Sequence, residues 1–263
     1  TQDAYTLTVN VVGDGSVGQY PDQTTYLYGD VVTLTAMADP GWAFAGWDGD
    51  LSGADNPESI TMDDNKVVTA TFTQDAYTLT VNVVGDGSVG QDPDQTTYLY
   101  GDVVTLTATA DPGWAFAGWD GDLSGSDNPD TLTMDDNKVV TATFTQDAYT
   151  LTVNVVGDGS VAIDPDQATY LYGDVVTLTA TADPGWTFAG WDGDLSGADN
   201  PESITMDDNK VVTATFTQDA YTLTVNVVGD GSVNQDPDQT TYLYGDVVTL
   251  TATADPGWTF AGW

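Results

Sequence analysis

The chain has no cysteine, no histidine and no arginine, and its only basic side chains are Lys66, Lys138 and Lys210. Without cysteine, no disulfide can stabilise the fold. Histidine and cysteine are also the commonest catalytic bases and nucleophiles, and the serines lie in turns without a partner base. The composition therefore indicates a protein that is not an enzyme, with no catalytic residues and no organic cofactor.

Basic charge is scarce, whereas acidic charge is abundant: 41 acidic residues give a net charge of −38. No basic surface is available to displace counterions from phosphates, which excludes nucleic acid and anionic membranes as partners. No apolar stretch approaches the roughly 20 residues that a membrane-spanning helix needs, so we expect no membrane insertion. The expected partners are divalent cations, above all Ca²⁺, or a medium of high salt that screens repulsion between neighbouring domains.

One unit is copied along the chain. The segment that begins Tyr5-Thr6-Leu7-Thr8-Val9 returns at Tyr77, Tyr149 and Tyr221, a spacing of 72 residues. This predicts repeats at residues 1–72, 73–144 and 145–216 and a partial repeat at 217–263, which stops before its acidic loop and last two strands. The chain is then either a window of a longer array or a filament protomer whose neighbour supplies the missing strands. Copying favours a spacer, a fibre or a multivalent binder.

The unit is predicted to be all-β, with little or no helix. Residues 5–11 alternate apolar and polar side chains, which is typical of a half-buried strand, and the Asp14-Gly15 pair that follows predicts a tight hairpin. In the aromatic strand 42–47, alternation puts Trp42 and Phe44 on one face and turns Trp47 away. Further strands are expected at 17–20, 25–28, 31–38, 59–62 and 67–72. The four-residue junction 73–76 lacks glycine and proline, which favours limited flexing between repeats and an elongated rod or filament.

The combination of these segments resembles the divergent internalin-type B-repeat family. The resemblance rests on residues 5–9, 13–17, 28–36, 41–47 and 67–72, and it recurs in every copy. It implies a small β-grasp-like or sandwich-like domain, repeated in an extracellular array on a bacterial surface as a stalk, spacer or adhesive surface. The family carries no catalytic motif. This chain is richer in aspartate than the family pattern, notably at Asp48 and Asp64, which points towards metal.

The loop after the aromatic strand has the spacing of a calcium-binding loop. In Asp48-Gly49-Asp50-Leu51-Ser52-Gly53, alternate oxygens can point inward and the glycine permits a sharp turn. Two readings stay open: a Ca²⁺ site, or a solvated acidic loop with side-chain turns, since Ser59 stands where an EF-hand needs glutamate and no helices flank the loop. The candidate ligands are Asp48, Asp50, Ser52, Asp55, Asp120, Asp122, Ser124, Asp127, Asp192, Asp194, Ser196 and Asp199.

Aromatic and basic residues carry three further alternatives. Trp42, Phe44 and Trp47 could stack on a sugar, but large aromatics in so small a domain favour the core, and a buried Trp47 would count against a sugar site. Tyr26 and Tyr28 face the same way and fit either the core or an interface. Lys66, beside Asp63 and Asp64, is expected to form a surface ion pair rather than an isopeptide bond.

Together these features predict an extracellular structural repeat protein on or outside a prokaryotic cell. It would form a stalk, fibre or matrix filament, stiffened by Ca²⁺ and able to self-assemble by sharing strands between units or protomers. The alternative is a multivalent adhesin or carbohydrate-binding array that recognises surface glycans or receptors on other cells. A third reading assigns the acidity to high-salt adaptation alone.

Overall fold

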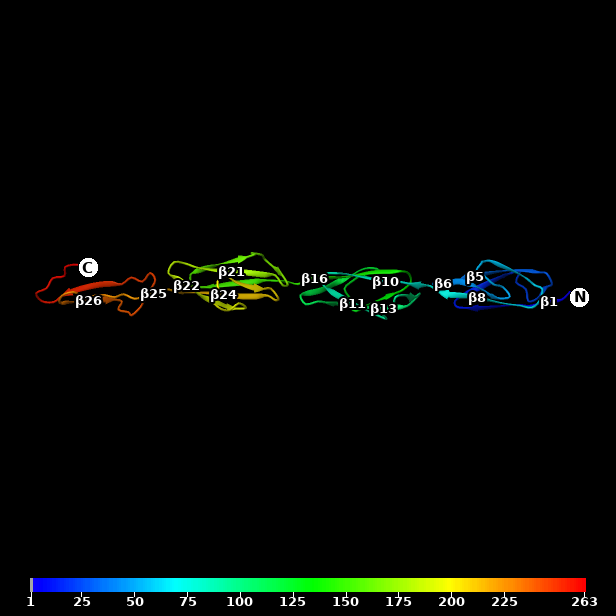
Figure 1. The fold of residues 1–263 in the computed structure, drawn as a ribbon, viewed down its shortest axis with the longest axis horizontal. Coiled ribbons are helices and arrows are strands. Elements are labelled where there is room, and N and C mark those ends of the chain that lie inside the picture. The colour runs from blue at the N-terminus through cyan, green and yellow to red at the C-terminus, as the bar shows by residue number, and fades with distance from the viewer. Residues whose placement is uncertain (1) are drawn as a thin grey trace. The chain divides into compact units, whose positions relative to one another are not determined.

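The computed structural model describes residues 2–263, and all its regular elements are strands (Figure 1). Because these residues form no helix, none of them could cross a membrane as one. The first repeat contains β1 (Ala4–Tyr5), β2 (Leu7–Val12), β3 (Gly15–Tyr20), β4 (Tyr26–Leu27), β5 (Val31–Ala38), β6 (Trp42–Gly49), β7 (Glu58–Thr61) and β8 (Lys66–Gln74). The prediction of an all-β fold built of tandem small repeats is confirmed.

The second and third repeats have the same elements. The second contains β9 (Ala76–Tyr77), β10 (Leu79–Val84), β11 (Gly87–Asp92), β12 (Tyr98–Leu99), β13 (Val103–Ala110), β14 (Trp114–Gly121), β15 (Asp130–Thr133) and β16 (Lys138–Gln146). The third contains β17 (Ala148–Tyr149), β18 (Leu151–Val156), β19 (Gly159–Asp164), β20 (Tyr170–Leu171), β21 (Val175–Ala182), β22 (Trp186–Gly193), β23 (Glu202–Thr205) and β24 (Lys210–Gln218). The chain divides into two compact units, residues 1–145 and 146–263.

Each complete repeat is a sandwich of two three-stranded sheets. One sheet has the order β2-β8-β6, with β8 in the centre, parallel to β2 and antiparallel to β6. The other has the order β3-β5-β7 and is antiparallel throughout. A short pair, β1 with β4, completes the repeat. The last strand of a complete repeat, β8 in the first, therefore holds its sheet together, because both other strands of that sheet pair with it.

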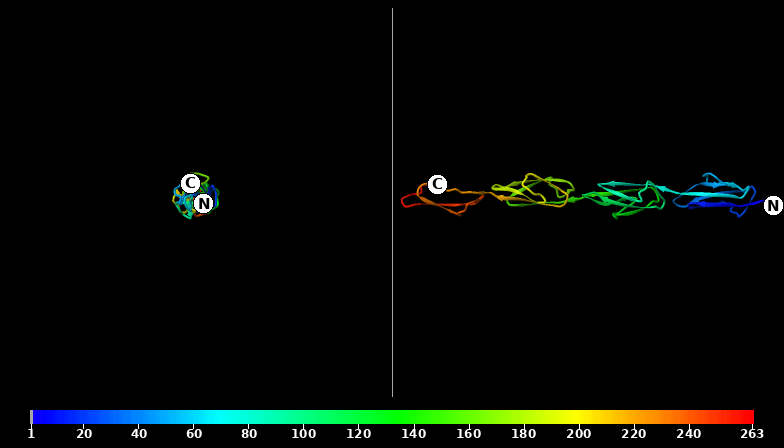
Figure 2. Two further views of the ribbon diagram at one scale, coloured as in Figure 1. Left: turned by 90° about the vertical axis from the view of Figure 1, so that its right-hand side faces the viewer. Right: turned by 60° about the horizontal axis from the view of Figure 1, so that its bottom comes forward.

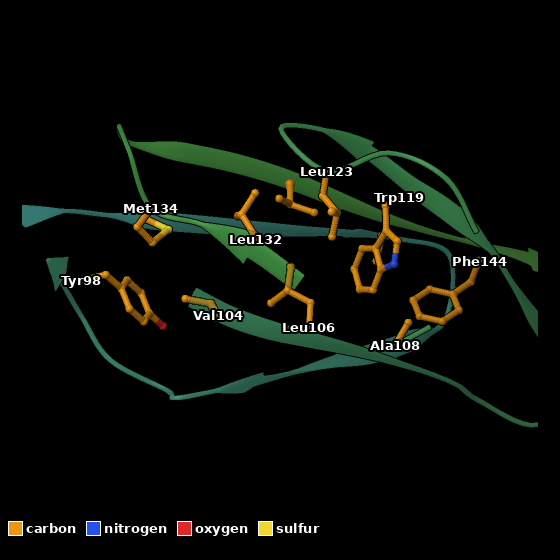
Figure 3. Packing of buried hydrophobic residues seen from close by; sticks show 11 residues of the cluster. Tyr98, Val104, Leu106, Ala108, Trp119, Leu123, Leu132, Met134 and Phe144 are labelled. Carbon is orange, nitrogen blue, oxygen red and sulfur yellow. The ribbon is translucent and has the colours of Figure 1, made fainter. Parts of the chain in front are cut away.

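The core lies between the two sheets and is built from alternate residues of their central strands. In the second repeat, Val104, Leu106 and Ala108 of β13 face Val140, Ala142 and Phe144 of β16. Figure 3 shows these layers closed at one end by Tyr98 and Met134 and at the other by Trp119 and Phe144. The alternation that predicts the strands thus also predicts which residues fill the core.

The hairpin predicted at Asp14-Gly15 is wrong. β2 and β3 belong to different sheets, so the turn carries the chain from one layer of the sandwich to the other. Gly13 has φ +84°, and a Cβ there would lie 2.4 Å from the carbonyl oxygen of Phe72. The Gly-Asp-Gly sequence serves this close approach to the closing strand rather than a strand-to-strand ladder.

The predicted orientation of Trp47 is also wrong, because β6 contains a bulge. Phe44 pairs with Phe72 and Gly46 with Thr71, so Ala45 is an extra residue without a partner. The bulge shifts the alternation by one residue and returns Trp47 to the same side as Phe44. The two rings pack with centroids 4.9 Å apart, and Trp47 is only 5% exposed.

The fourth repeat keeps only part of this sandwich. It contains β25 (Ala220–Tyr221), β26 (Gly231–Asp236), β27 (Tyr242–Leu243) and β28 (Thr249–Ala254). Residues 223–228 are the counterpart of β2, and residues 258–263 are the counterpart of the first six residues of β6. Neither segment forms a strand, and the C-terminal segment is drawn as a thin red coil in Figures 1 and 2. Since β2 and β6 pair only with β8, neither can form a ladder where this central strand is missing.

Candidate functional site

The acidic loop between β6 and β7 is held against the closing strand by Asp50. Its backbone N–H donates to the Val67 carbonyl (2.9 Å), and its Oδ2 accepts from the Val67 N–H (2.7 Å). The amide of Trp47 donates to the Gly53 carbonyl at 2.7 Å, which closes the loop. Asp50 therefore extends the pairing of β8 beyond the end of β6, a structural task that needs no metal.

The other predicted ligands of this loop point to separate partners. Asp48 Oδ1 accepts from the N–H of Gly49 at 2.8 Å, and the Asp55 carbonyl accepts from the Trp47 indole at 2.9 Å. Asp48, Ser52 and Asp55 are all exposed. Within residues 2–263, no three carboxylates gather into a preformed metal group. Calcium at this loop stays a prediction.

The loops of the second and third repeats repeat this geometry. Asp122 Oδ2 accepts from Val139 N–H at 2.7 Å, and Asp194 Oδ2 accepts from Val211 N–H at 2.6 Å. The carbonyls of Asp127 and Asp199 accept from the indoles of the equivalent tryptophans. The remaining predicted ligands, Asp120, Ser124, Asp192 and Ser196, are exposed.

Asn56 has a structural role in the loop that the sequence pattern does not predict. Its Oδ1 accepts from the Ala36 N–H (2.9 Å), and its Nδ2 donates to the Ala36 carbonyl (2.8 Å). β7 pairs with β5 only as far as Leu34, so the Asn56 amide takes over where the ladder ends. An asparagine shortly before a short strand is a weak signal, because asparagine is also a common turn residue.

The single lysine of each complete repeat pairs as predicted. Lys66 forms an ion pair with Asp63, and Lys138 and Lys210 repeat it with Asp135 and Asp207. The hydrogen bond from Lys66 lowers the pKa of the Asp63 carboxyl, and the same bond raises the pKa of the lysine. Asn65 of the same turn accepts from both the N–H and the hydroxyl of Thr6, at 2.8 and 3.0 Å. The turn is therefore fully explained as a structural element.

The junction between the first and second repeats, within the first compact unit, is an ordered contact. The amide of Asp75 donates to the Gly41 carbonyl (2.7 Å), the amide of Tyr100 donates to the Asp75 carbonyl (3.0 Å), and Gln74 Nε2 donates to the Tyr100 carbonyl (2.7 Å). The Tyr100 ring lies over Gly41: a Cβ on that glycine would be 2.0 Å from the ring. Only glycine allows the ring to approach so closely.

The second compact unit contains the same junction between its repeats. Asp219 N–H donates to the Gly185 carbonyl (2.8 Å), Tyr244 N–H donates to the Asp219 carbonyl (2.9 Å), and the Tyr244 ring covers Gly185. Gln218 Nε2 donates to the Tyr244 carbonyl at 2.9 Å. Tyr28, the counterpart in the first repeat, is 62% exposed, whereas Tyr100 is half-buried. From the sequence, Tyr26 and Tyr28 are each expected in the core or at an interface. Tyr26 lies in the core, and the counterparts of Tyr28, namely Tyr100 and Tyr244, lie at the junctions between repeats.

The comparison with protein families decides what these repeats are. The divergent InlB B-repeat domain matches residues 5–76, 77–148, 149–220 and 221–263. The chain belongs to this family. The first B-repeat of the family model covers residues 5–76, whereas the repeat predicted from the sequence covers residues 1–72. Each B-repeat therefore begins four residues later, and the first one ends at the last residue of the junction 73–76.

Other comparisons add less. A search of the curated proteins finds no match. Among solved structures, one similar chain is described as "The Bacillus anthracis TIE protein", with 7% identity and a TM-score of 0.43. The match covers 81% of this chain and 49% of that one, so this chain spans about half of its length. A similarity this distant carries no argument about function.

Proposed function

We propose that this chain is part of an extracellular structural array of a prokaryotic surface protein, in which B-repeats act as a stalk or spacer without catalytic activity. The observation that carries the proposal is the repeated junction of Gly41, Gln74, Asp75 and Tyr100. A flexible linker would need no such contact, whereas a spacer must transmit orientation from one repeat to the next. Family membership and the missing histidine and cysteine support the same role.

A distance measurement across the first junction tests this function. Because the chain has no cysteine, spin labels can be attached at Thr35→Cys and Thr107→Cys, equivalent exposed positions in neighbouring repeats. We expect a narrow distance distribution that broadens in Gly41→Ala, since any Cβ at Gly41 would collide with the Tyr100 ring.

Gly29→Ala is the matched control for this measurement. Gly29 has φ +86°, close to the +78° of Gly41, but a Cβ there meets nothing within 4 Å. The substitution carries similar backbone strain and should leave the distribution narrow. A distribution that is already broad in the unmodified chain would overturn the spacer function.

Calcium stiffening is a second part of the proposal, supported by the net charge of −38 and by exposed carboxylates in every acidic loop. Thermal unfolding in EDTA, in millimolar CaCl₂ and in NaCl of matched ionic strength separates a specific site from screening. The variant Asp50→Asn keeps an oxygen that can accept from Val67 while it removes the charge. We expect this variant to show a smaller Ca²⁺-dependent rise in Tm, with little change of its Tm in EDTA. If NaCl of matched ionic strength raises the Tm of the unmodified chain as much as CaCl₂ does, the acidic residues serve salt adaptation and not calcium binding.

The adhesive alternative has less support. Trp47 is 5% exposed and its indole donates to the Asp55 carbonyl, so it offers no face to a sugar. Strand sharing is not needed by the complete repeats, because β8, β16 and β24 each pair within their own repeat.

A further inference from the structure

β2 lies at the edge of its sheet, and its outer side carries free main-chain groups. Thr6 directs its carbonyl at the Lys66 amide (2.8 Å), and alternate residues of a strand point their main-chain groups to opposite sides. Leu7, Val9 and Val11 therefore direct their N–H and C=O groups away from β8. Among residues 2–263, no other element forms a hydrogen bond with these groups.

The other edges of the sandwich carry features that block pairing with another strand. β6 contains the bulge at Ala45, and β7 has only four residues and begins with Glu58. β3 begins with glycine, and its counterparts β11 and β19 end in Asp92 and Asp164. Bulges, short strands and charges are the usual devices that keep sheet edges apart, and β2 has none of them.

β2 is also uncharged and partly apolar on its exposed side. Its sequence contains no ionisable side chain, and β10 and β18 repeat it without change. Val11 and Val12 are 42% and 54% exposed, and their counterparts in the second and third repeats are exposed to nearly the same extent. Leu7 and Val9 pack against the core, and the alternation of β2 places Val11 on their side of the sheet.

We propose that this edge is a binding surface for a second copy of the chain, in which two β2 strands pair antiparallel about a two-fold axis. A basic peptide would be drawn to the carboxylates of the loops and turns, since this strand offers it no charge. Two copies of an acidic chain, in contrast, can approach each other closely only where carboxylates are absent. The surface acts between chains, so it goes beyond the spacer function and does not rest on it.

A register centred on Val9 satisfies the whole edge. With Val9 opposite Val9 of the second copy, the outward groups of Leu7 meet those of Val11, and main-chain hydrogen bonds join the two sheets into one. Leu7 of each copy then covers the exposed side chain of Val11 in the other. On the outer face of the joined sheet, Thr8 stands opposite Asn10 of the second copy.

The residues that flank β2 make this pairing depend on salt. Asp14 follows the strand, and the register brings it towards Ala4 of the second copy, beside Asp3. Carboxylates therefore meet at both ends of the contact, in addition to the general repulsion of a chain with a net charge of −38. Salt screens these charges, so we expect association to rise with NaCl concentration.

Cysteine trapping tests the surface and its register together. Because the chain has no cysteine, chains with Thr8→Cys and chains with Asn10→Cys can be mixed in molar NaCl under oxidising conditions. Opposed residues lie close enough for a disulfide, whereas Thr8 and Thr8 of the second copy are diagonal neighbours about 7–8 Å apart, at the limit of that reach. We therefore expect the mixed dimer to form about tenfold faster than either variant forms a dimer with itself.

Thr35→Cys is the control for random encounter. Thr35 is also exposed, but it lies on β5, the central strand of the other sheet, which has no free edge. Its disulfide dimer should form as slowly as the dimers of the unmixed variants. If the mixture of Thr8→Cys and Asn10→Cys reacts no faster than Thr35→Cys, or no faster than each variant alone, the proposed pairing is wrong.

Sedimentation velocity tests association without cysteine. We expect the unmodified chain to associate as NaCl is raised, and the variants are compared at the concentration that gives half association. One triple variant places a carboxylate on every complete edge: Asn10→Asp, Asn82→Asp and Asn154→Asp. The control adds the same charge at exposed positions of the central strands: Thr35→Asp, Thr107→Asp and Thr179→Asp.

The first triple variant should remain monomeric, because each contact would hold two new carboxylates close together. The control should associate as the unmodified chain does. A chain that stays monomeric in molar NaCl, or an equal loss of association in the two triple variants, would overturn the proposal.

Discussion

At the scale of single residues, polar side chains in this fold finish ladders that the strands leave incomplete. Asn56 hydrogen-bonds the backbone of β5 beyond Leu34, the last residue of β5 that pairs with β7. Asp50 likewise hydrogen-bonds the backbone of β8 beyond the end of its pairing with β6. Both residues lie in the loop whose composition suggests calcium binding. Their hydrogen bonds give the loop a structural role in each repeat, which any metal would supplement rather than replace.

We predict that Asn56→Ala destabilises the first repeat by about 1–3 kcal/mol, because the N–H and carbonyl of Ala36 would both lose their partner. Urea unfolding of the full chain measures this free energy. Asn10→Ala is the control, since Asn10 lies exposed on β2 and its truncation should change stability by less than about 0.5 kcal/mol. Equal effects of the two substitutions would show that the Asn56 contact is not the cause.

At the scale of elements, the alternating pattern predicts the strands closely but not the sheets to which they belong. Val31–Ala38 is predicted and observed with the same bounds. The sequence does not show that β2 and β3 lie in different sheets, because a Gly-Asp-Gly turn permits both a hairpin and a change of layer. The bulge at Ala45 is equally hidden, since a single extra residue leaves no mark in the pattern. The junction partners of Gly41 lie in the next repeat, beyond the reach of local patterns.

The turn that joins the two sheets packs against the closing strand. We therefore predict that replacing the first glycine of this turn lowers the free energy of unfolding by different amounts in different repeats. Gly157→Ala in the third repeat forces a Cβ to 2.4 Å from the Phe216 carbonyl in addition to its strain at φ +86°, and should cost about 1–3 kcal/mol or more. Gly229→Ala has the same local sequence and a similar φ of +93°, but no carbonyl is near it.

The fourth-repeat variant therefore isolates the clash from the backbone strain. It should lower stability by less than the third-repeat variant in the same denaturation experiment. If the two substitutions cost the same, the approach of the closing strand to the turn is not what requires glycine.

At the scale of the whole molecule, stability is spread unevenly although the sequence is copied almost without change. Each complete repeat has a core of about ten buried residues around its central strands, whereas Tyr242 is the one buried hydrophobic residue that the fourth repeat keeps. Residues 217–263 contain six aspartates and no lysine, so they carry less negative charge than any complete repeat. The difference in burial therefore comes from the sandwich and its central strand rather than from charge repulsion.

Hydrogen exchange should display this difference directly. We predict that the amides of 223–228 exchange nearly as fast as in an unfolded chain, while those of 151–156 are protected, because only the latter have a ladder partner in β24. The two segments have the same sequence, so their intrinsic exchange rates are equal and one serves as the control for the other. Proteolytic fragments that extend to Ala162 or to Asn234 differ in mass, which allows the two copies to be followed separately. Equal protection would mean that residues 223–228 find another strand in solution, and dilution would then show whether that strand belongs to a second copy of the chain.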